Sequence, residues 1–222
     1  MRDGIEYLGI ERVLQRGTGS VLEDLPGAQL VYDSVSGAYF LDCADEKTAF
    51  SVLDRYAEKM DLLSVTDAQL GALIFEKYSF RGKIDCWQVA YYGEKPSPDG
   101  ALTVRTAKES DLPMLREKYD MLSSGDLEKV VARGAILLGI YDGRVIGFIG
   151  EHLEGSMGLL QVFPEYRNRG FGTELEKHLI AATMDRGFVP FGQVEKDNLV
   201  SLRLQEKIGL TRSGRRILWM WR

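Results

Sequence analysis

The segment Val162-Phe-Pro-Glu-Tyr-Arg-Asn-Arg-Gly-Phe-Gly-Thr173 decides the fold. It stands between an apolar run that predicts a strand over 157–162 and an amphipathic stretch that predicts a helix over 173–186. The first backbone N–H groups of such a helix have no partner inside it, and they lie at the positive end of the helix dipole. The segment therefore predicts a strand-to-helix junction that is open to an anion.

Two glycines and two arginines give this junction its chemistry. Gly170 and Gly172 permit backbone conformations closed to residues with a Cβ, and they let a ligand approach the main chain. Arg167 and Arg169 add positive charge. A tight turn that needs glycine, with both arginines solvated, is the alternative. The spacing matches neither a P-loop nor a dinucleotide fingerprint, which argues against those nucleotide sites.

Composition and charge indicate an ordinary globular protein. The 222 residues are 45% hydrophobic and 27% charged, enough for one large or two small domains. The net charge of −5 and the isoelectric point near 5.2 argue against a general nucleic-acid binder, which needs a basic face. A local basic patch stays compatible with these values.

Targeting, membrane and metal signals are not visible in the sequence. The first residues lack a basic segment followed by an apolar run, and no apolar run approaches the roughly 20 residues of a membrane helix. Cys43 and Cys86 each stand in an apolar run, and their spacing suits neither a zinc site nor a disulfide framework. We expect two buried thiols, no metal and a cytoplasmic protein that binds no membrane.

The proline- and glycine-rich segment 93–100 predicts a boundary between two domains, 1–98 and 99–222. In the first domain, strands are expected at 28–34, 38–43, 61–65 and 84–92, and helices at 46–59 and 67–78. In the second, strands are expected at 102–107, 135–141, 144–151, 157–162, 189–195 and 215–221, and helices at 110–121, 126–133, 173–186 and 198–208. Ser110 is the expected N-cap of the first of these helices. Asp142-Gly143 is a strong hairpin signal, and a second turn is expected at 154–156.

Two motifs carry a resemblance to a known superfamily. The first is Val162-Phe-Pro-Glu-Tyr-Arg167 leading into Arg-x-x-Gly-x-Gly, and the second comprises Asn198-Leu-Val-Ser201 and Leu204-Gln-Glu-Lys-Ile-Gly-Leu210. Together with the Asp142-Gly143 hairpin they resemble the Gcn5-related N-acetyltransferase (GNAT) superfamily over residues 102–222. The resemblance implies an α/β (α+β) fold with a mixed central sheet flanked by helices.

Two shorter stretches narrow the resemblance. Leu160-Gln-Val-Phe-Pro-Glu-Tyr-Arg167 and Val194-Glu-Lys-Asp-Asn198 are similar to the FR47-like branch, which includes glycine N-acyltransferases. Proteins of that branch carry an N-terminal half that looks like a degenerate copy of the catalytic GNAT domain. Residues 1–95 suit that description and contain no Arg-x-x-Gly-x-Gly, so we expect no cofactor there.

The resemblance also implies how acyl-CoA is held. The strand before the loop splays from its neighbour, and main-chain groups of Gln161 and Val162 bind the pantetheine arm. Asn198 stands where the family has an amide beside the pantetheine, and it is equally suited to cap the helix that follows. The loop that takes the pyrophosphate comprises Arg167, Asn168, Arg169, Gly170, Phe171, Gly172 and Thr173.

The catalytic residues depart from the family pattern. Many members have a glutamate eleven residues before the Arg167 position, where this chain has Ser156, and a tyrosine where it has Gln205. The missing tyrosine matters less than the missing glutamate, because a thiol leaves reasonably well as thiolate without a strong acid. Gln205 can still donate a hydrogen bond to the sulfur. A backbone N–H near Val162 is the expected donor to the oxyanion.

The base that accepts the amine proton is expected in the hairpin before Ser156. We predict His152 or Glu154, which a regular strand would place on one face, with Glu151 on the other. Histidine is suited to proton transfer near neutral pH. A polar hairpin tip that faces water is the alternative for all three residues.

The leading hypothesis is an enzyme that transfers an acetyl or short acyl group from acyl-CoA to a small amine, such as an amino acid. A non-catalytic acyl-CoA sensor, which Ser156 and Gln205 would fit, and a protein N-acetyltransferase are the alternatives. An arginine-rich segment is either a cationic rim for a carboxylate-bearing acceptor or a solvated surface: Arg212, Arg215 and Arg216.

Overall fold

The structure is a computed structural model that describes residues 4–98, 100–120 and 122–222. By their internal contacts, its residues form two units that do not follow a single cut in the sequence. The first unit comprises Met1–Ala90, Gln193–Gln205 and Thr211–Arg222, and the second comprises Tyr91–Gly192 and Glu206–Leu210. Residue 99, at the expected boundary, lies outside the described residues, so the domains 1–98 and 99–222 stay a prediction.

The first unit contains a mixed sheet with the order β1-β2-β3-β4-β11-β5. Only β3 and β4 run parallel, and the other neighbours in this order are antiparallel. The strands are β1 Gly19–Leu25, β2 Ala28–Asp33, β3 Tyr39–Cys43, β4 Leu62–Val65, β5 Gly82–Ala90 and β11 Thr211–Trp221. The last strand of the chain therefore lies between two strands that precede it by more than a hundred residues.

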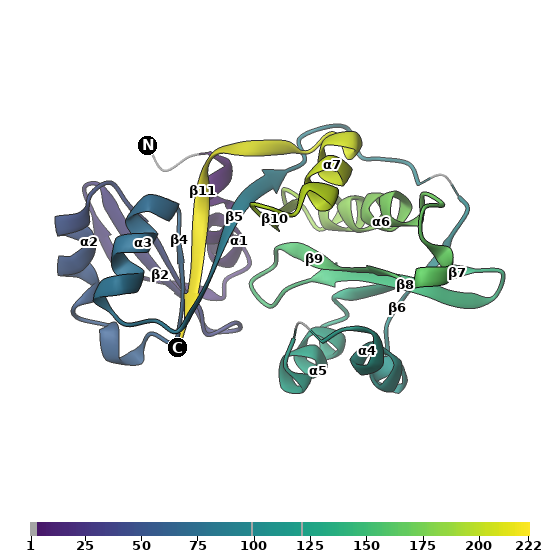
Figure 1. Cartoon of the computed structure of the whole chain (residues 1–222), viewed down its shortest axis with the longest axis horizontal. Helices are drawn as coiled ribbons and strands as arrows, with labels where there is room; N and C mark the ends of the chain where they lie inside the picture. The colour runs from purple at the N-terminus through teal and green to yellow at the C-terminus, as the bar shows by residue number, and fades with distance from the viewer. Residues whose placement is uncertain (1–3, 99, 121) are drawn as a thin grey trace. The chain divides into compact units, whose positions relative to one another are not determined.

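Alternation along these strands builds a core on each face of the sheet. In β2, Leu30 packs in the cluster that contains residues of helices α2 (Glu46–Leu53) and α3 (Ala68–Lys77). The next residue, Val31, packs in the cluster that contains residues of α1 (Leu8–Gln15). Successive side chains of a strand point to opposite faces, so this unit has helices on both sides of its sheet (Figure 1).

Two elements of the first unit, α1 and β1, were not predicted from the sequence. Helix α1 has no side-chain cap at its start, so the usual N-terminal signal was missing. Strand β1 has no residue that is fully buried and shows no regular alternation. The helix expected at 46–59 ends at Leu53, where its buried stripe ends, and a separate 3-10 turn follows at Ala57–Lys59.

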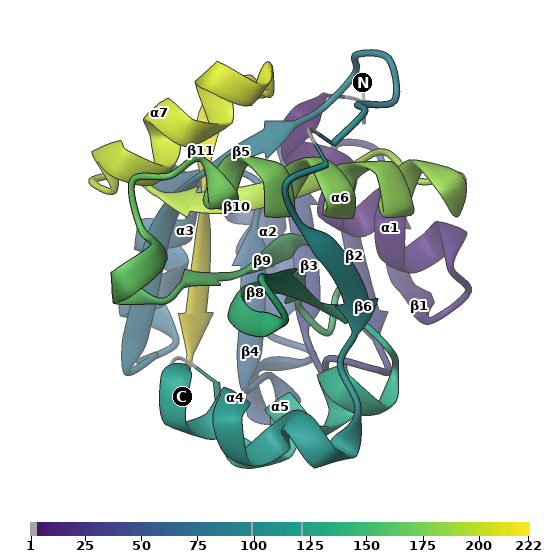
Figure 2. The ribbon, with the colours of Figure 1, turned by 90° about the vertical axis from the view of Figure 1, so that its right-hand side faces the viewer.

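The second unit places four antiparallel strands in the order β9-β8-β7-β6. Helix α6 (Phe171–Asp185) packs on one face, and α4 (Leu112–Lys118) and α5 (Ser124–Ala132) cover the other (Figures 1 and 2). The first residues of β10 (Phe191–Glu195) begin beside β9, with Gly192 parallel to Met157. The strands are β6 Thr103–Thr106, β7 Ile136–Tyr141, β8 Arg144–Glu151 and β9 Met157–Val162. The prediction of a mixed sheet flanked by helices is confirmed.

Turn chemistry set the hairpin at Asp142-Gly143 as expected, whereas Ser110 is not the N-cap that the sequence predicted. Asp142 and Gly143 both have positive φ, 49° and 73°, as a type I′ hairpin requires. The helix expected from Ser110 starts instead at Leu112 after a 3-10 turn, and the Asp111 carboxylate accepts the Lys108 N–H at 2.8 Å. The expected end of that helix, residue 121, lies outside the described residues.

Both cysteines are buried and free, which confirms the prediction of buried thiols. Burial, followed by the charges of Asp85 and Glu195, raises the pKa of the Cys86 thiol to about 12. Burial also raises the pKa of Cys43. Neither thiol is therefore activated as a nucleophile. In the described part of the chain, no helix combines the length and the apolarity needed to cross a membrane.

Asp33 is a fully buried carboxylate that should make the stability of the protein depend on pH in the acidic range. Burial alone would raise its pKa, but hydrogen bonds from Ser36 and Thr18 and the charge of Arg16 outweigh burial and lower it. A lowered pKa in the folded state stabilises the fold at pH values above the pKa of the unfolded state, which is near 4. This stabilisation is lost as pH falls through the pKa of the folded state.

We expect Asp33→Asn to destabilise the protein at pH 7 and to flatten the acid limb of its stability curve below about pH 4. Urea unfolding at a series of pH values measures both effects. Asp142→Asn, at an exposed hairpin position that suits asparagine, is the matched control and should leave the curve unchanged. Equal acid dependence in wild type and Asp33→Asn would contradict the assignment.

Candidate functional site

Strand β9 carries a bulge three residues before its end. Phe148 is in register with Gln161 and Gly150 with Gly158, so Ile149 of β8 faces two residues of β9. One of these, Leu159, has φ 54°, a conformation that non-glycine residues rarely adopt. Bulges interrupt a ladder and redirect backbone groups, and they are frequent beside active sites. The bulge therefore marks this part of β9 as a candidate binding segment.

After the bulge, Val162 directs its main chain away from β8. Phe163 donates its N–H to the Ile146 carbonyl at 2.9 Å, and successive residues of a strand turn their main-chain groups to opposite edges. The Val162 carbonyl is consistent with this orientation, because it accepts a hydrogen bond from Arg167 Nε at 2.9 Å rather than from β8. The same alternation turns the main chain of Gln161 toward β8. Gln161 and Val162 were both predicted to offer main-chain groups to a ligand. Only the main chain of Val162 faces the edge of β9 that points away from β8.

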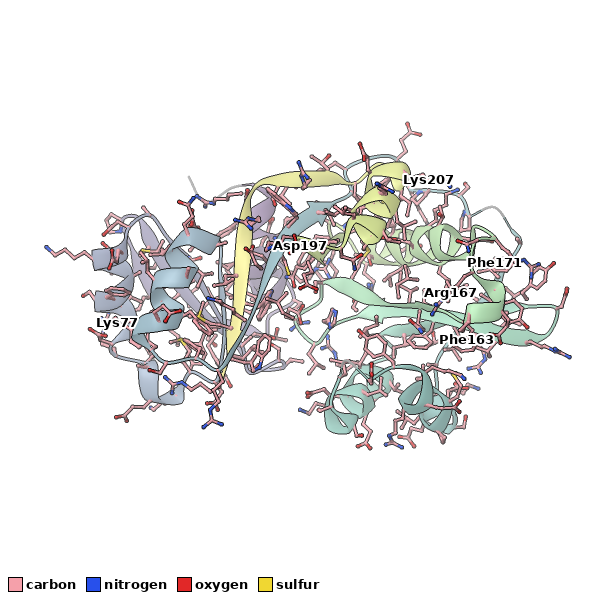
Figure 3. The ribbon with its side chains drawn as sticks, viewed as in Figure 1. Lys77, Phe163, Arg167, Phe171, Asp197 and Lys207 are labelled. Carbon is pink, nitrogen blue, oxygen red and sulfur yellow. The ribbon has the colours of Figure 1, made fainter. Side chains whose placement is uncertain are left out.

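The predicted anion loop joins β9 to α6 without a side-chain cap. A 3-10 turn at Pro164–Tyr166 leads into Asn168 and Gly170, whose φ values of 61° and 85° are left-handed. Gly170 is the N-cap of α6, and with no side chain it caps none of the first N–H groups of the helix. The helix begins at Phe171, two residues earlier than expected, because the left-handed glycine turns the chain directly into it. The loop is marked in Figure 3 by the labels on Arg167 and Phe171.

Two guanidinium groups lie at this helix N-terminus. Arg167 is tied to the Val162 carbonyl, and Arg169 stacks over Tyr141 at 4.8 Å and over Phe171 at 5.0 Å. Within the described ranges, neither arginine forms an ion pair with a carboxylate. Their charge adds to that of the helix dipole, so the loop attracts an anion.

The loop also leaves room at its glycines. A Cβ at Gly172 would meet nothing nearer than the Val162 side chain at 3.7 Å, and a Cβ at Gly170 would meet nothing within 4 Å. The packing of the protein itself therefore does not require Gly170 to lack a side chain, although its left-handed φ favours glycine.

The hairpin before β9 folds inward rather than facing water. Strand β8 ends at Glu151, and hydrogen bonds of 2.9 Å from His152 N to the Ser156 carbonyl and from Gly155 N to the His152 carbonyl close the turn. The regular alternation assumed for 151–154 therefore does not apply. Ser156 is fully buried and donates a hydrogen bond to the carboxylate of Glu154, which is also buried. The alternative of a water-facing polar tip is wrong for these side chains.

The carboxylate of Glu151 is held by structural partners. Its carboxylate accepts hydrogen bonds from Arg186 Nη2 at 2.7 Å, from Arg186 Nη1 at 3.0 Å and from Thr183 Oγ1 at 3.1 Å. Both partners belong to the C-terminal end of α6. The ion pair ties the end of β8 to α6 and thereby holds the start of the hairpin in place.

His152 lies against β9. Its imidazole occupies the space beside Gly158, where an added Cβ would come within 2.4 Å of Nε2. Gly158 immediately precedes the bulged Leu159. The structure thus brings a half-buried histidine next to the bulged segment of β9, and the residue at position 158 controls that approach.

Asn198 and Gln205 fall in the first unit, whereas the loop belongs to the second. The Asn198 side chain accepts the Ser201 N–H at 3.1 Å, so its expected role as the N-cap of α7 (Leu199–Ile208) is confirmed. Gln205 is buried on α7. Their predicted contacts with acyl-CoA stay predictions.

The arginines near the end of the chain do not form a free cationic rim. Arg216 pairs with Asp85 at 2.6 Å, and Arg215 lies 3.6 Å from Asp42. Arg212 stacks over Trp87 at 4.4 Å. Within the described ranges, no group of three or more His, Cys, Asp or Glu side chains is placed to hold a metal ion.

Comparison with known proteins finds a family that is similar to part of this chain. The family described as FR47-like protein matches residues 137–220, which contain the hairpin, the bulged strand, the loop and α7. No curated protein matches the chain at a significant level. The family match confirms the resemblance noted for the loop and for the segment around Asn198.

Solved structures extend the likeness to nearly the whole chain. A Drosophila protein superposes with a TM-score of 0.67 at 15% identity, over 88% of this chain and 74% of its own. A Novosphingobium aromaticivorans protein described as a GNAT-family acetyltransferase gives 0.59 at 19% identity, over 98% and 97%. A GCN5-related N-acetyltransferase-like protein from Streptococcus suis gives 0.55 at 17% identity, over 96% and 92%. At these identities the likeness shows the fold.

Proposed function

Because the chain has the GNAT acetyltransferase fold and its residues 137–220 match the FR47-like family, we propose that it is a CoA-dependent N-acyltransferase. It moves an acetyl or short acyl group from acyl-CoA to the amine of a small molecule, by direct attack in a ternary complex. The observation that carries the proposal is the uncapped N-terminus of α6 at left-handed Gly170, flanked by Arg167 and Arg169, which have no carboxylate partner among the described residues.

The geometry of the loop and the family resemblance together support the proposed position of the cofactor. The residues from Arg167 to Thr173 bind the pyrophosphate, through the first N–H groups of α6 and the guanidinium group of Arg167. The pantetheine arm follows β9, where the Val162 main chain faces away from β8. Asn198 supplies an amide while it caps α7.

Catalysis is assigned to the inward-folded hairpin. His152 accepts the proton of the attacking amine, directly or through a water molecule, because its ring lies at β9 beside the bulge. Glu154 is the second candidate, since its buried carboxylate is already hydrogen-bonded to Ser156. A backbone N–H near Val162 stabilises the oxyanion, and Gln205 donates to the departing sulfur.

A non-catalytic acyl-CoA sensor is the second candidate, favoured by Ser156 and Gln205 at positions where many family members have glutamate and tyrosine. Thiol release from acetyl-CoA, followed with a panel of small amines, separates the two functions. An enzyme releases thiol only when an acceptor is present. Submicromolar binding of acetyl-CoA with no amine-dependent release would support the sensor instead.

The alternative that the protein acetylates other proteins is tested by following the acetyl label. Labelled acetyl-CoA is incubated with a cell lysate, and the label is then sought in proteins and in small molecules. We expect it in small molecules. A cytoplasmic location is part of the proposal and is supported by the two free, buried thiols.

A further inference from the structure

Three aromatic rings from three different elements surround the guanidinium of Arg169. Tyr141 is the last residue of β7, Tyr166 ends the 3-10 turn, and Phe171 is the first residue of α6. The guanidinium carbon lies 4.8 Å from the ring centre of Tyr141, 5.0 Å from that of Phe171 and 6.0 Å from that of Tyr166. The rings of Tyr141 and Phe171 also contact each other, with their centres 5.0 Å apart.

This arrangement orders a charged side chain that would otherwise be mobile. A solvent-exposed arginine loses considerable rotamer entropy when it is held in one conformation, and stacking on aromatic faces offsets that loss. Stacking uses the faces of the guanidinium, whereas its N–H donors lie in the plane of the group. In the described chain no carboxylate takes those donors, so the rings present Arg169 with its donors available to an anion.

The position of the rings separates Arg169 from Arg167. Arg167 is fastened to Val162 of β9, whereas Arg169 is fastened to Tyr141 of β7, and β8 lies between these strands. The two guanidinium groups therefore flank the loop on different sides. Under the proposed function, in which the pantetheine lies on β9 and the pyrophosphate on the loop, the nucleotide end of CoA would extend beyond the loop, where Arg169 stands.

We propose that Arg169, positioned by Tyr141 and Phe171, binds the 3′-phosphate of CoA and makes the protein prefer CoA to 3′-dephospho-CoA. A phosphate monoester carries nearly two negative charges at neutral pH and offers three acceptor oxygens, which suits a guanidinium with free in-plane donors. The inference rests on the proposed function, because it requires that CoA occupies the loop. Arg169 is the binding residue, and Tyr141 is a positioning residue.

Calorimetric titration of the full chain with CoA and with 3′-dephospho-CoA tests the inference. We expect the wild type to bind CoA about tenfold more tightly or better. Arg169→Gln should remove this preference and leave the affinity for 3′-dephospho-CoA within about twofold. Tyr141→Leu should reduce the preference at least about threefold, whereas Tyr141→Phe, which keeps the ring, should retain it.

Arg144→Gln is the matched charge control. Arg144 is an exposed arginine in the hairpin that follows Tyr141, and its removal changes the net charge as Arg169→Gln does. It should leave the preference unchanged. Equal wild-type affinity for the two ligands, or equal losses in both arginine variants, would overturn the inference while leaving acyl-CoA binding intact. Absence of binding by either ligand would instead contradict the proposed function.

Discussion

Replacement of His152 by alanine is expected to lower kcat/KM by about 10²- to 10⁴-fold, the usual contribution of a positioned general base. Binding of acetyl-CoA should be unchanged, because the His152 ring lies at the bulge rather than at the loop. Initial rates with a saturating amine, together with calorimetric titration of acetyl-CoA, measure the two effects separately. The pH dependence of kcat/KM should change in the same variant.

Gly158→Ala tests the same assignment without removing the imidazole. The new methyl group would lie 2.4 Å from His152 Nε2, so the ring must move away from β9. We expect a fall in kcat/KM of at least about tenfold, with a smaller effect on stability because a side chain moves more easily than backbone. If neither His152→Ala nor Glu154→Gln lowered kcat/KM or altered its pH profile, the hairpin would not contain the base.

The second large effect is expected at the N-terminus of α6. Gly170→Ala should weaken binding of CoA about tenfold or more, because its methyl group would point into the open space that the pyrophosphate is proposed to fill. The left-handed backbone at φ 85° should also destabilise the variant by about 1–2 kcal/mol. Titration of CoA and thermal unfolding give both quantities.

Gly187→Ala separates the ligand effect from the backbone effect. Gly187 ends the same helix at φ 80°, and a Cβ there also meets nothing within 4 Å. The two variants should lose similar stability, but only Gly170→Ala should lose affinity for CoA. Equal affinities in the two variants would show that the space at Gly170 does not hold the cofactor.

Local patterns predicted those parts of the site that depend on neighbouring residues in the chain. Asp142-Gly143 specified a type I′ turn, and Gly170 specified the junction between β9 and α6, because conformations with positive φ select glycine, asparagine and aspartate. The N-cap at Asn198 followed in the same way. For such features the residue type and the backbone conformation are directly linked.

Other parts of the site depend on contacts through space. The bulge at Leu159 has no local signal, since leucine disfavours that conformation and only pairing with β8 imposes it. Tyr141 resembled any aromatic residue at the end of a strand, and its contact with Arg169 exists only after β7 and the loop have come together. The inward fold of 151–156 likewise depends on Arg186 and Ser156, which a pattern of alternation does not take into account.

The position of β11 has a consequence for synthesis on the ribosome. Residues 211–221 fill the place between β4 and β5, so the sheet of the first unit stays incomplete until nearly the whole chain has been translated. A nascent chain of about one hundred residues would expose the unpaired edges of both strands, and such edges promote association between chains. A stop codon before residue 211 would therefore leave β4 and β5 of the first unit without the strand that pairs with both.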